Sequence, residues 1–342
     1  MEAIILAGGY GTRLRPLTYT RSKSLLPILN KPMITYIINS LPNEVDKVIL
    51  AVNYKKDMIE QYFKENDHGK QIIVNDEKNP LGTGGATKFA EKHITGPFFV
   101  LNSDIICSLD LNEMMRFHQK KNAQTTISLW PVENVSEFGV VDITKDNKIT
   151  KFVEKPPIEE APSDLINAGA YLLEQEILDY IQPGKLISME KEIFPQIIAK
   201  TNRFYGFSIT GFWIDVGRIS SYIDVHKLLM KQSNIEFFEG LNCQINGELH
   251  KSSVGDHVII GDQSDIKSSI ILKETEIQNN VVLKNCVIGE NCKIGERTKL
   301  KNVVVGDNET VQKNTTLENK IVWNQPIPNG YPQKQIGNVI GE

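Results

Sequence analysis

The chain has 342 residues, of which 40% are hydrophobic, and a net charge of −4. This length and composition allow a large buried core in about two domains, and the negative charge argues against nucleic acid or an anionic membrane as a constant partner. The first apolar segment starts directly after Met1 and no apolar run reaches the ~20 residues of a membrane span, so we expect a cytoplasmic protein.

The first predicted strand, residues 3–6, ends in a turn that has almost no side chains. The residues of this turn with a small side chain or none are Ala7, Gly8, Gly9 and Gly11. Without Cβ atoms, backbone N–H groups can approach a ligand closely, and Thr12, Arg13 and Arg15 add a hydroxyl and two guanidinium groups, the donors that a polyphosphate needs. The spacing excludes a P-loop, which needs a lysine after the second glycine, and a dinucleotide fingerprint, which needs a third glycine at Leu14.

Strands and helices alternate after this turn. We expect helices at 33–41, 58–63 and from the end of PLGTGGA (80–86) to His93, and strands at 48–52, 72–74 and 98–101. After Trp130 the predicted strands are shorter, at residue 140 and at 149–153, 170–173 and 212–216, and a last helix covers about 220–231. This order predicts a doubly wound, Rossmann-like α/β domain with a mixed sheet over residues 1–234.

From about Cys243 the sequence repeats every seventeen residues. Aliphatic side chains recur at this interval in three series, with steps of six, six and five within each repeat. The series are Val254, Ile271, Ile288, Val305 and Val322; Ile260, Ile277, Ile294 and Val311; and Ile266, Leu283, Leu300 and Leu317. Hexapeptide steps predict a parallel β-helix over residues 243–325, with the aliphatic side chains stacked inside it. Residues 326–342 are predicted to form a tail.

The segment LAGGYGTRLRPLT at 6–18, with Lys23 and the sequence NKPM at 30–33, resembles the signature of the sugar-1-phosphate nucleotidylyltransferases. The likeness is strongest to those members that join GTP to mannose 1-phosphate. It implies a nucleotidyltransferase fold with a left-handed β-helix, a nucleoside triphosphate and a sugar 1-phosphate as substrates, and Mg2+ as cofactor. The nucleotide contacts that it implies are Leu6, Ala7, Gly8, Gly9, Gly11, Thr12, Arg13, Gly82 and Thr83.

Two aspartates follow apolar segments of the predicted α/β domain. In an open α/β sheet the carboxyl ends of strands face the ligand, and an unpaired buried carboxylate is costly unless a cation or donors meet it. Mg2+ usually takes one or two protein carboxylates together with phosphate oxygens and water. The resemblance places the family's metal ligands at Asp104 and Asp215. The alternative is that either aspartate caps a turn or a helix.

The resemblance also implies catalytic roles for Arg13 and Lys23, which would offset charge on the transferring phosphorus and on the departing pyrophosphate. Ser22 and Ser24 stand where prolines commonly flank this lysine, so a solvated surface position for Lys23 stays open. Near these motifs the sequence has no Ser-His-Asp set and no Cys-His pair, which favours direct displacement without a covalent intermediate.

The segments FVEKP and INAGAY resemble the sugar-binding segments of the family. The resemblance implies that Glu154 and Asn167 contact sugar hydroxyls, that Lys155 contacts the sugar phosphate, and that the sugar packs on Gly139. From the residues alone, Glu154 and Lys155 are equally compatible with an exposed pair on opposite faces of a strand.

The choice of base depends on Glu77, five residues before Gly82. Guanine presents two donors on one edge, N1–H and the 2-amino group, and a carboxylate accepts without donating. Uracil and thymine place one donor between two carbonyls, which a carboxylate opposes. Glu77 therefore favours guanine, by on the order of tenfold to several hundredfold. The alternative is a solvated loop charge in the charge-rich segment NDEKN.

These observations predict a Mg2+-dependent transferase that makes a nucleotide sugar and pyrophosphate, with GTP and mannose 1-phosphate favoured. The alternatives are uridylyl or thymidylyl transfer to glucose 1-phosphate and a regulatory or scaffolding relative without catalysis. We expect the β-helix to join copies of the chain in a homo-oligomer. Acyl transfer through His250 or His257 is the other interpretation of this domain.

Overall fold

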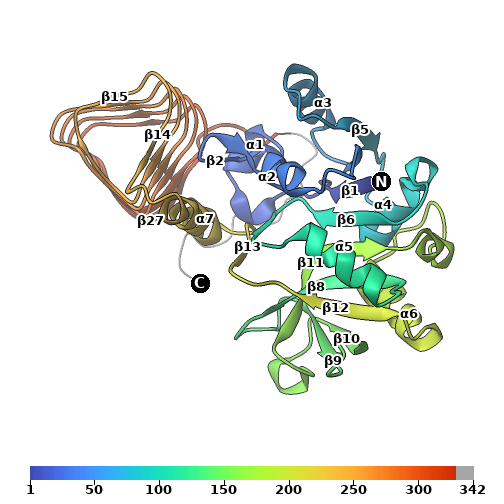
Figure 1. The fold of residues 1–342 in the computed structure, drawn as a ribbon. Coiled ribbons are helices and arrows are strands. Elements are labelled where there is room, and N and C mark those ends of the chain that lie inside the picture. The colour runs from blue at the N-terminus through green and yellow to red at the C-terminus, as the bar shows by residue number, and fades with distance from the viewer. Residues whose placement is uncertain (329–342) are drawn as a thin grey trace. The chain divides into compact units, whose positions relative to one another are not determined.

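The computed structural model describes residues 1–328, so residues 329–342 of the predicted tail lie outside the described residues. The chain folds as two compact units (Figure 1). The first unit holds Met1–Gly9 and Ile34–Ile214, and the second holds Tyr10–Met33 and the residues from Asp215 onward. The glycine-rich turn is therefore divided between the units, after Gly9.

The core of the first unit is a mixed sheet, which confirms the α/β prediction. Its central strands lie in the order β6-β1-β4-β5 and are parallel. They are β1 (Glu2–Leu6), β4 (Lys47–Val52), β5 (Gln71–Asp76) and β6 (Phe98–Asn102). β1 and β4 are buried along almost their whole length, as expected for parallel strands that are covered on both faces. Because these strands share a direction, their carboxyl ends lie at one edge of the sheet.

Antiparallel strands extend the sheet beyond β6. The central one, β11, pairs with β6, β8 and β9. The strands of this region are β8 (Thr125–Pro131), β9 (Gly139–Ile143), β10 (Ile149–Glu154), β11 (Leu165–Leu173) and β12 (Phe204–Ser208), with a separate pair formed by β7 (Ile105–Cys107) and β13 (Trp213–Asp215). β7, β8 and β12 are additional to the strands that the sequence predicted.

Five α-helices belong to the first unit. They are α2 (Met33–Ser40), α3 (Lys56–Glu65), α4 (Gly82–Phe89), α5 (Leu111–Lys120) and α6 (Phe194–Lys200), and the shorter turns are η3 (Glu91–His93), η4 (Ile158–Glu160), η5 (Gln175–Tyr180) and η6 (Met189–Ile193). The expected start of α4 was wrong, because the helix begins inside PLGTGGA. Its glycines let the helix lie against another segment: the N–H groups of Gly84 and Gly85 donate to the carbonyl of Ile187, and a Cβ at Gly85 would lie 2.4 Å from the carbonyl oxygen of Lys185.

The second unit contains a column of stacked parallel coils, which confirms the β-helix prediction (Figure 1). Its strands are β14 (Phe238–Glu239), β15 (Gln244–Ile245), β16 (Glu248–His250), β17 (Ser253–Val254), β18 (Ile259–Ile260), β19 (Asp265–Lys267), β20 (Ile270–Ile271), β21 (Glu276–Ile277), β22 (Val282–Lys284), β23 (Val287–Ile288), β24 (Lys293–Ile294), β25 (Lys299–Val305), β26 (Thr310–Val311) and β27 (Thr316–Val322). All three aliphatic series pair in register between successive coils. Most of these side chains are buried in one core.

The rest of the second unit is the segment Tyr10–Met33 and a helix, α7 (Ile219–Gln232). The segment contains η1 (Thr12–Leu14), α1 (Leu17–Thr20), η2 (Lys23–Leu25), β2 (Pro27–Ile28) and β3 (Lys31–Pro32). Tyr222 of α7 donates to the carbonyl of Pro27 at 2.5 Å, and His226 lies 2.7 Å from the hydroxyl of Ser253 in the β-helix. α7 therefore contacts both the segment and the β-helix.

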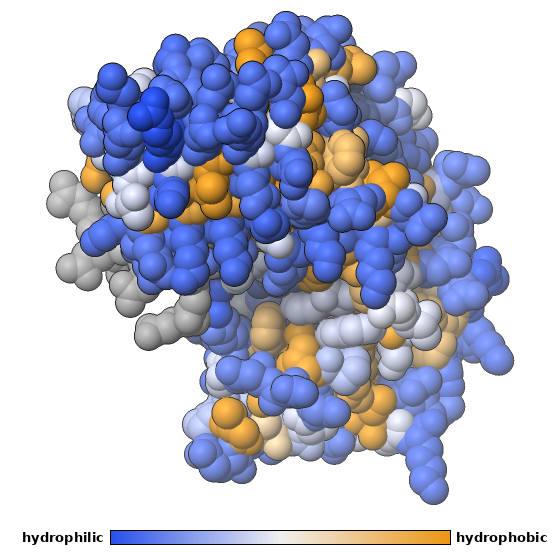
Figure 2. Space-filling view, turned by 90° about the vertical axis from the view of Figure 1, so that its left-hand side faces the viewer, coloured by the Kyte–Doolittle hydropathy of each residue, from blue (hydrophilic) through white to orange (hydrophobic). Residues whose placement is uncertain are grey.

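The described residues contain no helix that combines the length and the apolar character needed to cross a bilayer. The face shown in Figure 2 is mostly hydrophilic, with small groups of hydrophobic residues between the polar ones.

Candidate active site

A pocket of about 330 Å³ opens in the first unit where the parallel strands end. Gly8 follows β1, Asn53 follows β4, Glu77 follows β5 and Asp104 follows β6, so at least one lining residue comes from the carboxyl end of each parallel strand. The complete lining is Leu6, Gly8, Gly9, Ala51, Asn53, Glu77, Pro80, Leu81, Gly82, Thr83, Ala86, Asn102 and Asp104. This edge is where α/β sheets bind their ligands.

The pocket gathers most of the nucleotide-binding residues predicted for this unit. Those that line it are Leu6, Gly8, Gly9, Glu77, Gly82 and Thr83. Ala7 is buried and donates its N–H to the carbonyl of Ala51 at 2.9 Å, so its place is in the wall behind the pocket. Asn53, Asn102 and the apolar lining residues other than Leu6 were not predicted, because no motif of the sequence indicated them.

Glu77 is a buried acid with an incomplete set of partners. It is 5% exposed, which excludes the solvated loop charge, and among the described residues its Oε1 atom has no hydrogen-bond partner. Burial raises the pKa of Glu77 to about 7, against a smaller opposing effect of the Leu81 backbone N–H. A buried carboxyl group with an unused acceptor in a pocket wall is suited to receive donors from a ligand.

The glycines of the pocket differ in whether the structure has room for a Cβ atom at their position. A Cβ at Gly8 would lie 3.3 Å from the Cβ of Asn53, whereas a Cβ at Gly9 would have no atom of the described residues within 4 Å. Gly82 has a φ of +71°, and a Cβ there would lie 2.5 Å from the carbonyl oxygen of Ile187. Gly82 is therefore required by the fold at the start of α4, while Gly9 leaves open space beside the pocket.

Two residues of the predicted sugar site are in direct contact. Glu154 at the end of β10 is the register partner of Gly139 at the start of β9, and a Cβ at Gly139 would lie 2.8 Å from Oε2 of Glu154. Burial, together with the charge of Glu190, raises the pKa of Glu154. The Lys155 side chain is 60% exposed and its Nζ lies 3.9 Å from the Glu154 carboxylate. Lys155 therefore points to solvent from a residue with a φ of +51°.

A polar network connects Asn167 of the predicted sugar site to Thr83 in the wall of the pocket. The Asn167 amide donates to the hydroxyl of Tyr171 at 2.8 Å, and this hydroxyl donates to Glu190 at 3.0 Å. Glu190 in turn accepts from the hydroxyls of Thr83 and Ser188, each at 2.6 Å. Glu190 lies in η6, a π-helical turn, and such turns are frequent at functional sites. INAGAY contains Tyr171, but no pattern in the sequence indicated Glu190.

The second unit gathers the remaining predicted residues. A Cβ at Gly217 would lie 2.7 Å from Nη2 of Arg13 and 3.0 Å from Oδ1 of Asp215, so this guanidinium and this carboxylate both lie beside Gly217. Gly11 has a φ of +61°, and a Cβ there would lie 3.1 Å from the Cβ of Lys23. Lys23 is 8% exposed, which excludes a solvated surface position. Thr12, at the start of η1, is exposed.

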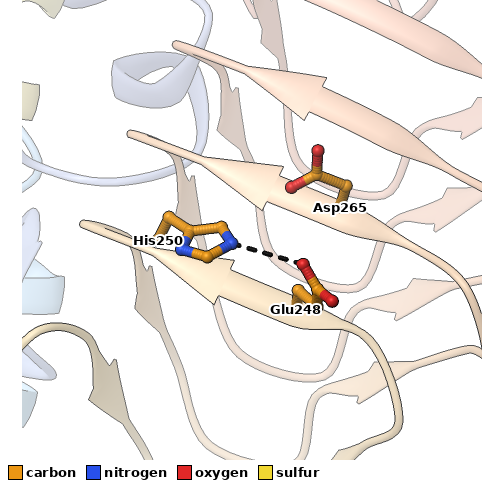
Figure 3. Close-up of side chains that lie close together, drawn as sticks. All are labelled: Glu248, His250 and Asp265. Carbon is orange, nitrogen blue, oxygen red and sulfur yellow. Dashed lines mark hydrogen bonds and ion pairs between the residues drawn. The ribbon is translucent and has the colours of Figure 1, made fainter.

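The β-helix holds a cluster that the sequence did not predict, formed by Glu248, His250 and Asp265. Their ligand atoms lie within 4.8 Å of one another, and Figure 3 shows Glu248 and His250 together on β16 with Asp265 on the neighbouring strand. Nζ of Lys267 lies 2.5 Å from the Asp265 carboxylate and already balances its charge. We therefore assign no metal to this cluster. His257, the other histidine considered for acyl transfer, is exposed in a turn with a φ of +58°.

Comparison with known proteins assigns both parts of the chain. Residues 2–232 match the model of the nucleotidyl transferase family, and residues 241–336 match that of the GMPPB C-terminal domain. The chain is 42% identical over 231 residues to a mannose-1-phosphate guanyltransferase of Saccharomyces cerevisiae and 42% identical over 230 residues to a mannose-1-phosphate guanyltransferase beta-A of Xenopus laevis. Each alignment spans 65% of this chain and 63% of the relative.

Two solved structures are similar to this chain. The crystal structure of HddC from Yersinia pseudotuberculosis is 29% identical, with a TM-score of 0.56 over 67% of this chain and 99% of that one. A second structure of HddC, in complex with GMP-PN, is 30% identical over the same shares, also with a TM-score of 0.56. The family match covers more than half of the residues and includes the pocket at the carboxyl ends of the parallel strands. The chain belongs to the nucleotidyl transferase family.

Proposed function

We propose that the protein transfers a guanylyl group from GTP to mannose 1-phosphate, giving GDP-mannose and pyrophosphate. The observation that carries the proposal is a pocket lined both by glycines and by Glu77, a buried acid with one oxygen that lacks a hydrogen-bond partner within the described residues. The names of the relatives that are 42% identical support the same reaction, and the GMP-PN complex of HddC supports the binding of a nucleotide.

Glu77 would select the base. The donors N1–H and 2-amino of guanine complement a carboxylate, and binding would supply the hydrogen bonds that Oε1 lacks within the described residues. Uracil or thymine would set a carbonyl against this buried acid, at a cost of a few kcal/mol. The glycine-rich turn and the start of α4 would hold the rest of the nucleotide. The residues proposed for this are Leu6, Ala7, Gly8, Gly9, Gly11, Thr12, Arg13, Gly82 and Thr83.

The sugar phosphate would bind through residues of β9, β10 and β11. Glu154 and Asn167 would accept from and donate to sugar hydroxyls, and Gly139 would leave room for the ring. The exposed Lys155 ammonium would pair with the phosphate. Tyr171 and Glu190 fix the Asn167 amide through their hydrogen bonds, which limits the ways in which a sugar can lie there.

Asp104 and Asp215 would hold the divalent metal ion, which we propose to be Mg2+. Both offer carboxylate oxygens, the ligand type that Mg2+ prefers, and Asp104 lines the nucleotide pocket. When bound, the ion would supply positive charge to the phosphate oxygens. Members of this family usually depend on a divalent metal.

The transfer needs little covalent chemistry from the protein. An oxygen of the sugar phosphate, already ionised at neutral pH, attacks the α-phosphorus of GTP and forms the new P–O bond. The bond between the α-phosphorus and the bridging oxygen breaks, and pyrophosphate leaves with that electron pair. Arg13 and Lys23 offset the charge that develops, and no general base is required.

A substrate panel tests the proposal. Pyrophosphate release is measured with purified full-length protein, Mg2+, each of GTP, ATP, UTP and dTTP, and mannose 1-phosphate or glucose 1-phosphate. We expect the highest kcat/KM with GTP and mannose 1-phosphate. Faster turnover with UTP or dTTP would overturn the choice of base, and no turnover with any pair would favour a regulatory or scaffolding role. The homo-oligomer and the cytoplasmic location stay predictions.

A further inference from the structure

Arg21 is a buried cation in the segment Tyr10–Met33 and is bound by the β-helix. It is 7% exposed. Its two terminal nitrogens donate to different carboxylates, Nη1 to Glu290 and Nη2 to Asp307. These partners lie on successive coils, seventeen residues apart. Arg21 therefore ties the segment to two coils at once, and the planar guanidinium fixes the direction of both bonds.

Asp307 is the most fully satisfied acid of this contact. It is 3% exposed, its Oδ1 accepts the backbone N–H of Glu290 at 2.7 Å, and its Oδ2 accepts from Arg21 and from the hydroxyl of Thr20. Glu290 has a second cation, since Nζ of Lys273 lies 3.9 Å from its carboxylate. Each acid thus has a partner on the preceding coil of the β-helix in addition to Arg21.

The contact continues along one column of turns in the β-helix. Asp256, two coils before Glu290, accepts from the Asn30 amide at 2.7 Å. At the other end, the ring of Trp323 packs on Tyr19 with centroids 5.1 Å apart. The segment is therefore held near its middle by Arg21 and on both sides of it by Tyr19 and Asn30.

The anchored segment carries residues to which we assign catalysis. Arg21 is two positions before Lys23 and eight after Arg13. The hydroxyl of Thr18 donates to the Gly11 carbonyl at 2.9 Å, and Gly11 packs against the Lys23 side chain. A displacement of residues 18–23 from the β-helix would therefore move both Gly11 and Lys23.

Stability alone does not account for a buried Arg with two acids. Removing the Arg21 guanidinium and the Asp307 carboxylate from water costs several kcal/mol each, and packed apolar side chains often stabilise a core equally well or better. An ionic contact does fix distances and directions more narrowly than apolar packing does. This property matters where a loop must hold phosphate-binding groups to within a fraction of an ångström.

We propose that Arg21, held by Asp307 and Glu290, is a positioning residue for nucleotidyl transfer: through it the β-helix holds Lys23 and Gly11 in the geometry that the reaction needs. This inference rests on the proposed function. The β-helix is then a part of the catalytic apparatus, besides any role in assembly.

The test compares stability with activity in full-length variants. Arg21→Met leaves Asp307 buried without its cation, and the double variant Arg21→Met with Asp307→Asn removes both charges while the Asn oxygen still accepts from Glu290. Unfolding in urea and pyrophosphate release are measured on each. We expect the double variant to recover stability relative to Arg21→Met, yet to keep a kcat reduced by roughly tenfold or more. The KM for the sugar phosphate should change little, because its proposed ligands belong to the first unit.

Two further variants complete the test. Arg21→Lys keeps the charge but not the planar fork, so we expect it to fold and to lose several-fold in kcat even if Arg21→Met does not fold. Glu318→Gln breaks an exposed ion pair with Lys301 on the same β-helix and should retain full activity. Wild-type kcat in Arg21→Lys, or in the double variant once its stability has returned, would overturn the proposal. An inactive wild-type protein would instead refute the proposed function.

Discussion

Each unit of this molecule contains a carboxyl group that is almost fully buried, and the two groups differ in how many of their oxygens accept hydrogen bonds from the chain. Glu77 in the first unit is 5% exposed, has an unsatisfied oxygen within the described residues and a pKa raised to about 7. Asp307 in the second unit is 3% exposed and accepts hydrogen bonds from Arg21, Thr20 and a backbone N–H.

We interpret this difference as that between a proposed ligand site and a support for the fold. A buried acid whose partners all come from the chain lowers the energy of the folded state only while each partner is present. A buried acid with an acceptor that has no partner destabilises the folded state. Such a group is typical of a site where a bound ligand supplies the missing hydrogen bonds. Glu77 is therefore expected to matter for substrate choice, and Asp307 for the folded state and the loop it supports.

Asp104 extends the comparison, because it lines the same pocket as Glu77 but has a different proposed task, the binding of Mg2+. Asp104→Asn should lower kcat on the order of 10³-fold with little change in the urea midpoint, since a neutral amide binds Mg2+ poorly. Pyrophosphate release with GTP and mannose 1-phosphate measures the effect.

The control for this variant is Asp110→Asn. Asp110 caps α5 by accepting the N–H of Glu113 at 3.0 Å, so its change should lower stability slightly and leave kcat unchanged. If Asp104→Asn kept more than a tenth of the wild-type kcat, the metal role of Asp104 would be lost and only the comparison of Glu77 with Asp307 would remain.

Neutralising the two buried acids should change the free energy of unfolding in opposite directions. Asp307→Ala leaves Arg21 buried beside one acid only and should cost about 3 kcal/mol or more in the free energy of unfolding. Because the folded-state pKa of Glu77 is raised above its ordinary value, the folded state loses stability as pH rises through about 7. Glu77→Gln should therefore stabilise the protein at pH 8 and have almost no effect near pH 4.5.

Urea unfolding of both variants at the two pH values provides the measurement. Equal destabilisation by Asp307→Ala and Glu77→Gln at pH 8 would show that both acids support the fold, and the distinction between them would fail.

The affinity for a guanine nucleotide should also depend on the ionisation of Glu77. Guanine donors need the ionised form of Glu77, so the affinity for GDP-mannose should rise by roughly tenfold between pH 6 and pH 8. GDP-mannose is the suitable ligand because its diphosphate has no ionisation near neutral pH. Calorimetric titration of the wild type and of Glu77→Gln checks this, and a rise that persists in Glu77→Gln would have to come from another group.

The smallest effect is expected at the surface of the β-helix. Lys301 and Glu318 form an exposed pair on neighbouring coils, with both side chains about half exposed. Glu318→Gln should change the free energy of unfolding by less than about 1 kcal/mol, because water and salt screen exposed charges. If Glu318→Gln lowered the free energy of unfolding as much as Asp307→Ala does, burial would not decide how much an acid contributes to the stability of this domain.

Periodicity made much of the fold predictable. The interval of seventeen residues determined which aliphatic side chains of the β-helix pair, because each coil must repeat the geometry of the one below. In the first unit, an apolar run followed by Gly8 or by Asp104 was enough to locate the edge where the pocket opens, since ligands bind at the carboxyl ends of parallel strands.

Contacts between distant residues were not predictable in this way. Glu190 meets Thr83 through a hydrogen bond across 107 positions, and Arg21 meets Asp307 across 286. Neither pair has a fixed spacing that a motif could record. The division of the glycine turn between two units is a further example, because LAGGYGTRLRPLT reads as one continuous motif.

The central claim is that Glu77 selects the base, and the ratio of kcat/KM for GTP to that for UTP tests it most directly. We predict that the wild-type protein favours GTP by on the order of tenfold to several hundredfold, and that Glu77→Gln reduces this ratio at least roughly tenfold while the protein stays folded. A wild-type preference for UTP, or the same ratio in Glu77→Gln as in the wild type, would contradict the claim.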